Sequence, residues 1–325
     1  MSHILEVEGL TTVFDGDGGR TVSASGVSFF VEKGEIVCIV GESGCGKSVT
    51  SLSIMGLLGR GGRVESGKVL FEGRDLLAMS EQELDAIRGD TLSMIFQDPL
   101  TSLNPVFTVG SQIAESIRVH LGMNKKEALL RAEQLLEKVG MPDPKRTMKK
   151  YPHMLSGGQR QRVMIAMALC CSPKLLIADE PTTALDVTIQ AQIMDLIRHL
   201  RTEFGMAVIL ITHDIGVVAQ MADRVLVMYA GQIVEQAPVL TLFDHPAHPY
   251  TQALLRSVPP LPRTQSEEIP RLESIGGTVP EHYDRIVGCR FAERCPYRSK
   301  ECEQPQSEVV CGSQHTVRCW RGGRV

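Results

Sequence analysis

A glycine-rich loop in the first fifth of the chain has the residue types needed to hold a triphosphate. Gly41-Glu42-Ser43-Gly44-Cys45-Gly46-Lys47-Ser48 fits the pattern G-x-x-x-x-G-K-[ST]. The glycines let backbone N–H groups turn toward an anion, Lys47 adds positive charge, and Ser48 offers a hydroxyl to Mg²⁺. A helix expected over 49–57 directs its positive end at the same anion. The loop alone predicts nucleoside triphosphate binding and does not separate ATPases from kinases or GTPases.

Two adjacent carboxylates form the second candidate element. The apolar run Leu175-Leu176-Ile177-Ala178 predicts a buried strand, and Asp179 and Glu180 end it. Asp179 is suited to hold Mg²⁺ through its water shell, opposite Ser48. Glu180 is suited to polarise a water molecule for attack on the γ-phosphorus.

A second helix start with anion-binding character lies before these acids. Ser156 and the two glycines of Leu155-Ser156-Gly157-Gly158-Gln159 precede a helix expected over 161–169, whose first N–H groups would be free. One triphosphate does not require two such helix starts in one chain. We therefore expect this one to contact a nucleotide held by another subunit.

The type and order of these segments resemble the ABC ATPases. Gln97 in Phe96-Gln97-Asp98-Pro99 matches the Q-loop of that family, Asp186 in Ala184-Leu185-Asp186 its D-loop, and His213 its switch histidine. Phe14 matches the aromatic residue that stacks on adenine, although a single Phe at a strand end is equally consistent with a core position.

The resemblance implies a dimer in which two ATPase domains enclose two ATP molecules. It implies that Glu180 is the general base, that His213 orients the γ-phosphate and the attacking water, and that Gln97 links the metal site to the segment facing membrane subunits. The ATP-binding residues implied are Phe14, Gly41, Glu42, Ser43, Gly44, Cys45, Gly46, Lys47, Ser48 and Val49; Mg²⁺ would be held at Ser48, Gln97 and Asp179; and the partner's ATP would meet Leu155, Ser156, Gly157, Gly158 and Gln159.

Four further segments resemble, more narrowly, the ATPase subunits of oligopeptide and dipeptide permeases, a group that includes importers of nickel and other small solutes. They are Ile95–Pro105, Tyr151-Pro152-His153, Asp186–Gln192 and His248-Pro249-Tyr250-Thr251. The resemblance implies an ATPase on the cytoplasmic face of a membrane that energises peptide import. Its partners would be a related, non-identical ATPase subunit, two membrane permease subunits and, indirectly, an extracytoplasmic solute-binding protein. No nucleic-acid partner is expected.

Buried strands that alternate with amphipathic helices position these segments. Residues 35–40, 174–178 and 207–211 predict parallel strands, and 124–139 and 188–204 predict helices between them. Asn124 is the expected cap of the first of these helices, and Gly140 follows its end. This alternation of strands and helices predicts an α/β fold. The resemblance to ABC ATPases implies, in addition, a P-loop ATPase with a RecA-like mixed sheet, a β-subdomain and a helical subdomain that carries Ser156. The Pro-rich run Val258–Pro262 predicts a boundary between an ATPase domain over 1–258 and a small cysteine-rich C-terminal module over 259–325.

The cysteines of that module suggest a metal site. Five of the nine cysteines of the chain are Cys289, Cys295, Cys302, Cys311 and Cys319. Their wide spacing lacks the paired C-x₂₋₄-C knuckles of structural zinc sites and better suits the corners of an iron–sulfur cluster. The segment Gly288–Pro296 resembles the C-terminal module of peptide-permease ATPases, some of which carry a [4Fe–4S] cluster. The expected ligands are Cys289, Cys295, Cys302 and Cys319, with Cys311 outside the set; Zn²⁺ and metal-free thiols remain the alternatives.

Bulk composition fits a globular ATPase and separates it from other classes only weakly. The chain has 325 residues, 43% of them hydrophobic and 22% charged, with a net charge of −4. It has no apolar run long enough to span a bilayer, and its start lacks the apolar core of a signal peptide. A soluble ABC ATPase of translation or DNA repair would usually carry two ATPase domains or a coiled-coil insertion, and a small-molecule kinase would leave residues 155–159 unexplained.

Overall fold

The computed structural model describes residues 3–16, 19–183, 185–257, 275–280 and 282–322, which form two compact units. Unit 1 consists of the described residues within 1–5, 31–36 and 71–211, and unit 2 of those within 6–30, 37–70 and 212–325.

Unit 1 contains three neighbouring parallel strands. They are β6 (Leu92–Ile95), β7 (Leu175–Asp179) and β8 (Ala207–Thr212). Every residue of the three is buried, as expected for strands covered on both faces. Asp179, at the carboxyl end of β7, pairs with Ile211 of β8. The two predicted carboxylates, Asp179 and Glu180, thus lie at the carboxyl end of β7. Unit 1 also includes β5 (Arg74–Asp75), the 3₁₀ turn η1 (Leu76–Ala78) and α2 (Glu81–Ile87).

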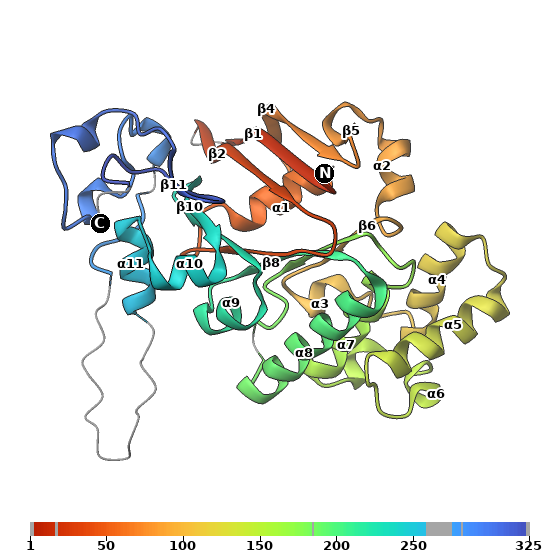
Figure 1. Cartoon of the computed structure of the whole chain (residues 1–325). Helices are drawn as coiled ribbons and strands as arrows, with labels where there is room; N and C mark the ends of the chain where they lie inside the picture. The colour runs from red at the N-terminus through yellow and green to blue at the C-terminus, as the bar shows by residue number, and fades with distance from the viewer. Residues whose placement is uncertain (1–2, 17–18, 184, 258–274, 281, 323–325) are drawn as a thin grey trace, which may run out of the picture. The chain divides into compact units, whose positions relative to one another are not determined.

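The helices of unit 1 gather around α7, which carries the Ser156 segment. In Figure 1, α4 and α5 lie side by side, and α7 contacts both of them. Asn124 caps α5 by accepting hydrogen bonds from the N–H groups of Lys126 and Glu127, as its position predicted. The bounds are α3 (Pro99–Ser102), α4 (Val109–Leu121), α5 (Lys125–Lys138), α6 (Pro144–Thr147), η2 (Pro152–Met154), α7 (Gly157–Ala168) and α8 (Val187–Phe204).

Unit 2 contains two groups of strands. In the first, β1 (Leu5–Gly16) lies between β2 (Gly19–Val31) and β4 (Gly62–Phe71). In the second, β3 (Ile36–Val40) pairs in parallel with β9 (Arg224–Tyr229), and the antiparallel strands β10 (Gln232–Pro238), β12 (His315–Val317) and β11 (Val309–Gly312) continue from β9. The last two strands come from the C-terminal residues and extend a sheet that also contains the strand before the phosphate loop.

Short helices complete unit 2. α1 (Lys47–Met55) follows the phosphate loop, and α9 (Ile215–Met221) follows His213. The C-terminal part contains α10 (Val239–Asp244), α11 (Pro249–Arg256), η3 (Tyr283–Arg285), η4 (Ala292–Arg294) and η5 (Lys300–Glu303). The predicted boundary at residue 258 lies outside the described residues. Within the described part of the chain, no helix has the length and apolar character needed to cross a bilayer.

Candidate nucleotide-binding site

Close packing of the backbone explains two glycines of the phosphate loop. A Cβ at Gly41 would lie 2.1 Å from the carbonyl oxygen of Met228, in β9. A Cβ at Gly46 would lie 2.3 Å from the carbonyl oxygen of Ser23, and Gly46 has a φ of 101°, in the left-handed region. A side chain at either position would push the loop away from the strands. The loop therefore depends on glycine for its curvature.

Lys47 lies inside the curve of the loop. Its ammonium group donates hydrogen bonds to the carbonyl oxygens of Gly41 (2.9 Å) and Glu42 (3.1 Å), and the residue is buried. The helix α1 begins at Lys47 with Gly46 as N-cap, and no side chain of the described residues caps it. A buried cation beside uncapped N–H groups is a suitable cradle for phosphate oxygens, so these residues fit the triphosphate expected from the sequence.

Phe14 is half-buried in β1, beside the start of β4. A Cβ at Gly62 would lie 2.7 Å from the ring carbon Cε1 of Phe14. The ring is neither a core residue nor fully exposed, and a stacking role for it stays a prediction.

The two proposed catalytic residues of unit 1 contact each other. The Gln97 amide donates a hydrogen bond to Glu180 Oε2 (3.1 Å), and the Thr183 hydroxyl donates to the same oxygen (2.9 Å). The backbone N–H of Glu180 donates to the carbonyl oxygen of Ile211 (2.9 Å). Glu180 has a φ of 44°, which costs a non-glycine residue about 1–3 kcal/mol and persists only where neighbouring contacts enforce it. Thr183 was missed from the sequence, because a threonine three residues after an acid is common in ordinary turns.

The remaining single-residue assignments lie at the ends of elements. Asp179 ends β7 and is buried, as expected for a carboxylate enclosed in a site. Asp186 is the N-cap of α8 and accepts a hydrogen bond from the N–H of Ile189 (3.0 Å). His213 is exposed between β8 and α9, next to Asp214, which caps α9. Thus the phosphate loop and His213 belong to unit 2, and Gln97, Asp179, Glu180 and Asp186 belong to unit 1.

The Ser156 segment differs from the sequence prediction in one respect. Helix α7 begins at Gly157, earlier than residue 161, and Ser156 is its N-cap. Ser156 Oγ accepts from the Gln159 N–H (3.4 Å), and Gln159 Oε1 accepts from the Ser156 N–H (3.3 Å). The predicted set of free N–H groups is therefore wrong for Ser156 and Gln159, which cap each other. Both bonds are long, so an anion has weak competitors here. Gly158 is required by packing, since a Cβ there would lie 2.9 Å from Ile189 Cγ2.

The four predicted cluster ligands surround one small cavity in unit 2. Cys289, Cys295, Cys302 and Cys319 line it together with aromatic side chains and His248, whereas Cys311 lines a different cavity. Burial, and to a smaller extent the neighbouring cysteines, raise the pKa of Cys289 to about 11. His248 is buried; its Nδ1 accepts from the Tyr250 N–H (3.0 Å), and its Nε2 is buried with no partner among the described residues. The Nε2 of His248 at this thiol-lined cavity is thus placed where a bound group would meet a hydrogen-bonding atom.

The metal assignment itself is not confirmed. Among the described residues, no group of three or more His, Cys, Asp or Glu side chains lies close enough together to hold a metal ion. This finding does not fit Zn²⁺, which needs all of its ligands within about 2.0–2.3 Å of one ion. The [4Fe–4S] prediction for Cys289, Cys295, Cys302 and Cys319 likewise has no metal-binding geometry behind it here. A cluster differs from one ion in that each cysteine binds a different iron atom, so its ligands are farther apart.

Comparison with family models gives two matches. The model described as ABC transporter matches residues 24–183, and the model described as oligopeptide/dipeptide transporter, C-terminal region, matches residues 234–302.

Curated relatives match over nearly the whole chain. The probable peptide ABC transporter ATP-binding protein y4tR of Sinorhizobium fredii is 52% identical over 99% of this chain and 96% of its own length. The oligopeptide transport ATP-binding protein AppD of Bacillus subtilis is 52% identical over 98% of this chain and 97% of its own. The dipeptide transport ATP-binding protein DppD of the same organism is 50% identical over 98% and 95%.

Solved structures agree with these matches. A dimeric structure of the bacterial ABC transporter cassette MJ0796 is 29% identical and has a TM-score of 0.65, over 72% of this chain and 98% of its own. A second structure of MJ0796, a post-hydrolysis state bound to ADP and Pi, is 28% identical with a TM-score of 0.66 over the same shares.

Proposed function

Since this chain belongs to the ATP-binding subunits of ABC transporters, we propose that it drives peptide import across a membrane. ATP hydrolysis is the activity of the family. One member, the cassette MJ0796, has been solved in a post-hydrolysis state bound to ADP and Pi. One observation supports peptide as the transported solute. Residues 234–302 match the C-terminal region of oligopeptide/dipeptide transporters, in a chain that is about half identical to peptide-transport ATPases along its length. Import of nickel or another small solute is the alternative.

An exposed apolar loop supports the proposal of membrane partners. Val106 is 71% exposed and Phe107 53%, in the loop that follows Gln97 and precedes α4. Gln112 fixes this loop: its amide donates to the carbonyl oxygens of Asn104 and Phe107, and its Oε1 accepts from the Asn104 N–H. Large apolar side chains held exposed are typical of a surface that another protein covers. We place the permease subunits on this loop and the chain on the cytoplasmic face of their membrane.

The rest of the assembly follows from the resemblance. We propose a related, non-identical ATPase subunit as the dimer partner, and an extracytoplasmic solute-binding protein that delivers the peptide. In that dimer Ser156 of one subunit faces the ATP held by the phosphate loop of the other, as the weak capping bonds of Ser156 allow.

We propose the following roles for the individual residues, as the resemblance to ABC ATPases implies. Lys47 neutralises phosphate charge, and Glu180 takes a proton from the attacking water while His213 orients that water. Ser48, Gln97 and Asp179 would hold Mg²⁺, which supplies charge neutralisation at the phosphates. The contact between Gln97 and Glu180 ties the proposed base to the residue that leads into the membrane-facing loop.

Reconstitution with membrane subunits tests this function. Purified chain, partner ATPase and permease subunits in lipid vesicles should hydrolyse ATP faster when a peptide-loaded binding protein is added. Glu180→Gln should abolish both hydrolysis and uptake. Stimulation by nickel ions with no response to peptide would overturn the peptide assignment, and stimulation by DNA or ribosomes instead of membrane subunits would overturn the transport assignment.

For the thiol-lined cavity we propose a [4Fe–4S] cluster held by Cys289, Cys295, Cys302 and Cys319. The support is their shared cavity and the unpartnered Nε2 of His248, which is a donor because Nδ1 accepts a hydrogen bond. A donor beside cluster sulfur would shift the reduction potential. Protein purified without oxygen should contain about four irons per chain and absorb broadly near ~400 nm. Colourless protein with zinc, or with no metal, would refute the cluster.

A further inference from the structure

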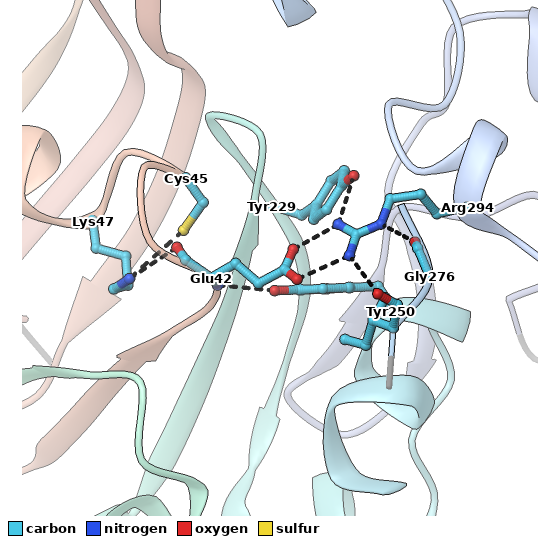
Figure 2. Close-up of polar contacts among 8 residues, drawn as sticks. Glu42, Cys45, Lys47, Tyr229, Tyr250, Gly276 and Arg294 are labelled. Carbon is cyan, nitrogen blue, oxygen red and sulfur yellow. Dashed lines mark hydrogen bonds and ion pairs between the residues drawn. The ribbon is translucent and has the colours of Figure 1, made fainter. Parts of the chain in front are cut away.

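The second residue of the phosphate loop, Glu42, is held from both its backbone and its side chain. Its N–H donates to Tyr250 Oη (3.0 Å), and its carbonyl oxygen accepts from Lys47 Nζ (3.1 Å). Its two carboxylate oxygens accept from the guanidinium group of Arg294, at 2.6 and 2.9 Å (Figure 2). The loop that is proposed to hold ATP is thus attached to α11 and to the C-terminal cysteine-rich region.

Arg294 is itself rigidly placed. Its side chain is only 5% exposed, and Nε donates to the carbonyl oxygen of Gly276 (2.8 Å). The guanidinium also donates to Tyr229 Oη (3.3 Å) and lies 5.7 Å from the centre of that ring. A bidentate pair between a guanidinium and a carboxylate is directional, and removal of one partner leaves the other charge poorly solvated. The pair therefore resists displacement of Glu42.

A second arginine of the same segment acts on the other end of the loop. Arg290 is buried and donates to the carbonyl oxygen of Ala230. The next residue, Gly231, donates its N–H to the carbonyl oxygen of Cys45 (2.9 Å). Both arginines lie between Cys289 and Cys295, two of the cysteines at the thiol-lined cavity. One short stretch of chain thus supports the phosphate loop at Glu42 and at Cys45.

From these contacts we propose that Arg294 is a positioning residue for ATP: it fixes the phosphate loop through Glu42, so the C-terminal region sets the affinity of the loop for nucleotide. The proposal rests on the assignment of ATP to this loop. A ligand that needs one loop conformation binds less tightly in proportion to the fraction of protein that adopts it. Without Arg294 the loop samples other conformations, and the Glu42 carboxylate, no longer neutralised, repels the phosphates.

Nucleotide binding measured on three variants of the full chain tests the proposal. Arg294→Gln should weaken binding of ATP roughly 5- to 30-fold, as expected when one charged, bidentate pair of about 1–2 kcal/mol is lost. kcat at saturating ATP should change less than about twofold, because Arg294 does not touch the reacting atoms. Arg294→Lys keeps the charge and should recover part of the affinity. Arg298→Gln, an exposed arginine of the same segment, is the matched control and should bind ATP like the parent chain.

A mutant cycle separates positioning of the loop from general support of the fold. Glu42→Gln together with Arg294→Gln should weaken binding by much less than the product of the two single effects, because both remove the same pair. Multiplicative effects, or an unchanged affinity in Arg294→Gln, would overturn the proposal.

Tyr250→Phe offers a second route if the arginine variants unfold. The aromatic ring is buried against Tyr229 and Phe291 and is preserved, so only the acceptor of the Glu42 N–H is lost. A folded Tyr250→Phe protein should bind ATP several-fold more weakly, and unchanged binding would count against the proposal. Lys47→Ala tests the ATP assignment separately: equal ATP binding in Lys47→Ala and the parent chain would overturn that assignment, whatever Arg294 does.

Discussion

The loop of residues 104–107 depends on one buried side chain, and replacing it should separate ATP hydrolysis from transport. Gln112, in α4, is 6% exposed and makes three hydrogen bonds to this loop. Their lengths are 2.9 Å from the Asn104 N–H to Oε1, and 3.0 Å from Nε2 to each of the carbonyl oxygens of Asn104 and Phe107. Gln112→Leu removes all three while it preserves the apolar volume.

The size of the effect follows from the number and exposure of these bonds. Three hydrogen bonds at about 1 kcal/mol each hold the loop with about 3 kcal/mol, which corresponds to more than a hundredfold preference for the observed conformation. The loop residues themselves are exposed, so their freed backbone groups regain water when the loop opens. The loss in global unfolding free energy should therefore be only about 1–2 kcal/mol, whereas the loop should lose most of its preference.

Hydrogen exchange measures the loosening of the loop, and ATPase assays with and without the membrane subunits measure its effect on coupling. Amide exchange at Val106 and Phe107 should accelerate at least tenfold in Gln112→Leu, with little change in the strands β6 and β7. Hydrolysis by the isolated chain should remain within about twofold, while stimulation by membrane subunits should fall severalfold. Glu115→Leu introduces the same leucine at an exposed position of α4 and is the control.

The reasoning fails if exchange at residues 104–107 is unchanged in Gln112→Leu. The proposed role of the loop in coupling fails if the loop loosens in Gln112→Leu and stimulation by the membrane subunits persists.

Three further predictions concern the catalytic acid, the phosphate loop and a helix cap. Glu180→Gln should still bind ATP but hydrolyse it roughly 10²–10⁴ times more slowly in single-turnover assays, and normal turnover would remove Glu180 as the base. Gly46→Ala should abolish ATP binding and lower the melting temperature, because its Cβ would lie 2.3 Å from the Ser23 carbonyl oxygen at a φ of 101°; a stable, binding-competent variant would contradict that packing. Asn124→Ala should reduce the unfolding free energy by about 1 kcal/mol in denaturant titrations, and Asn124→Asp, which keeps the capping oxygen, should not.

Local patterns were sufficient to predict several of the elements that position the site residues. The all-apolar run ending at Ala178 identified β7, and the Asn124 cap and Gly140 identified the limits of α5, because these signals lie within a few residues of the structure they specify. The start of α7 was placed four residues too late. Two glycines in succession are poor helix formers, but here both lie in the first turn of α7, where a Cβ at Gly158 would lie 2.9 Å from Ile189 Cγ2.

Contacts between distant segments could not be read from the sequence. Glu42 and Arg294 are separated by 252 residues, and neither has a local pattern that predicts the other. Glu42 occupies a position of the phosphate-loop pattern at which any residue is allowed, so the motif gave no reason to assign it a separate role. The contact of Gln97 with Glu180 is likewise a product of the parallel register of β6 and β7, which places the residues after both strands at one edge.

The contact between Gln97 and Glu180 bears on how ATP hydrolysis is coupled to the membrane subunits. In the structure Oε2 of the Glu180 carboxylate accepts hydrogen bonds from Gln97 and Thr183, so these two bonds occupy an oxygen that an attacking water molecule would have to meet. The backbone of Glu180 is held in the left-handed region by its bond to the Ile211 carbonyl oxygen, so the acid itself has little freedom to move. Gln97 is exposed, and the short helix α3 connects it to the loop fixed by Gln112. We therefore infer that release of Glu180 for hydrolysis comes from motion of Gln97, and that a partner bound to Val106 and Phe107 is well placed to cause it.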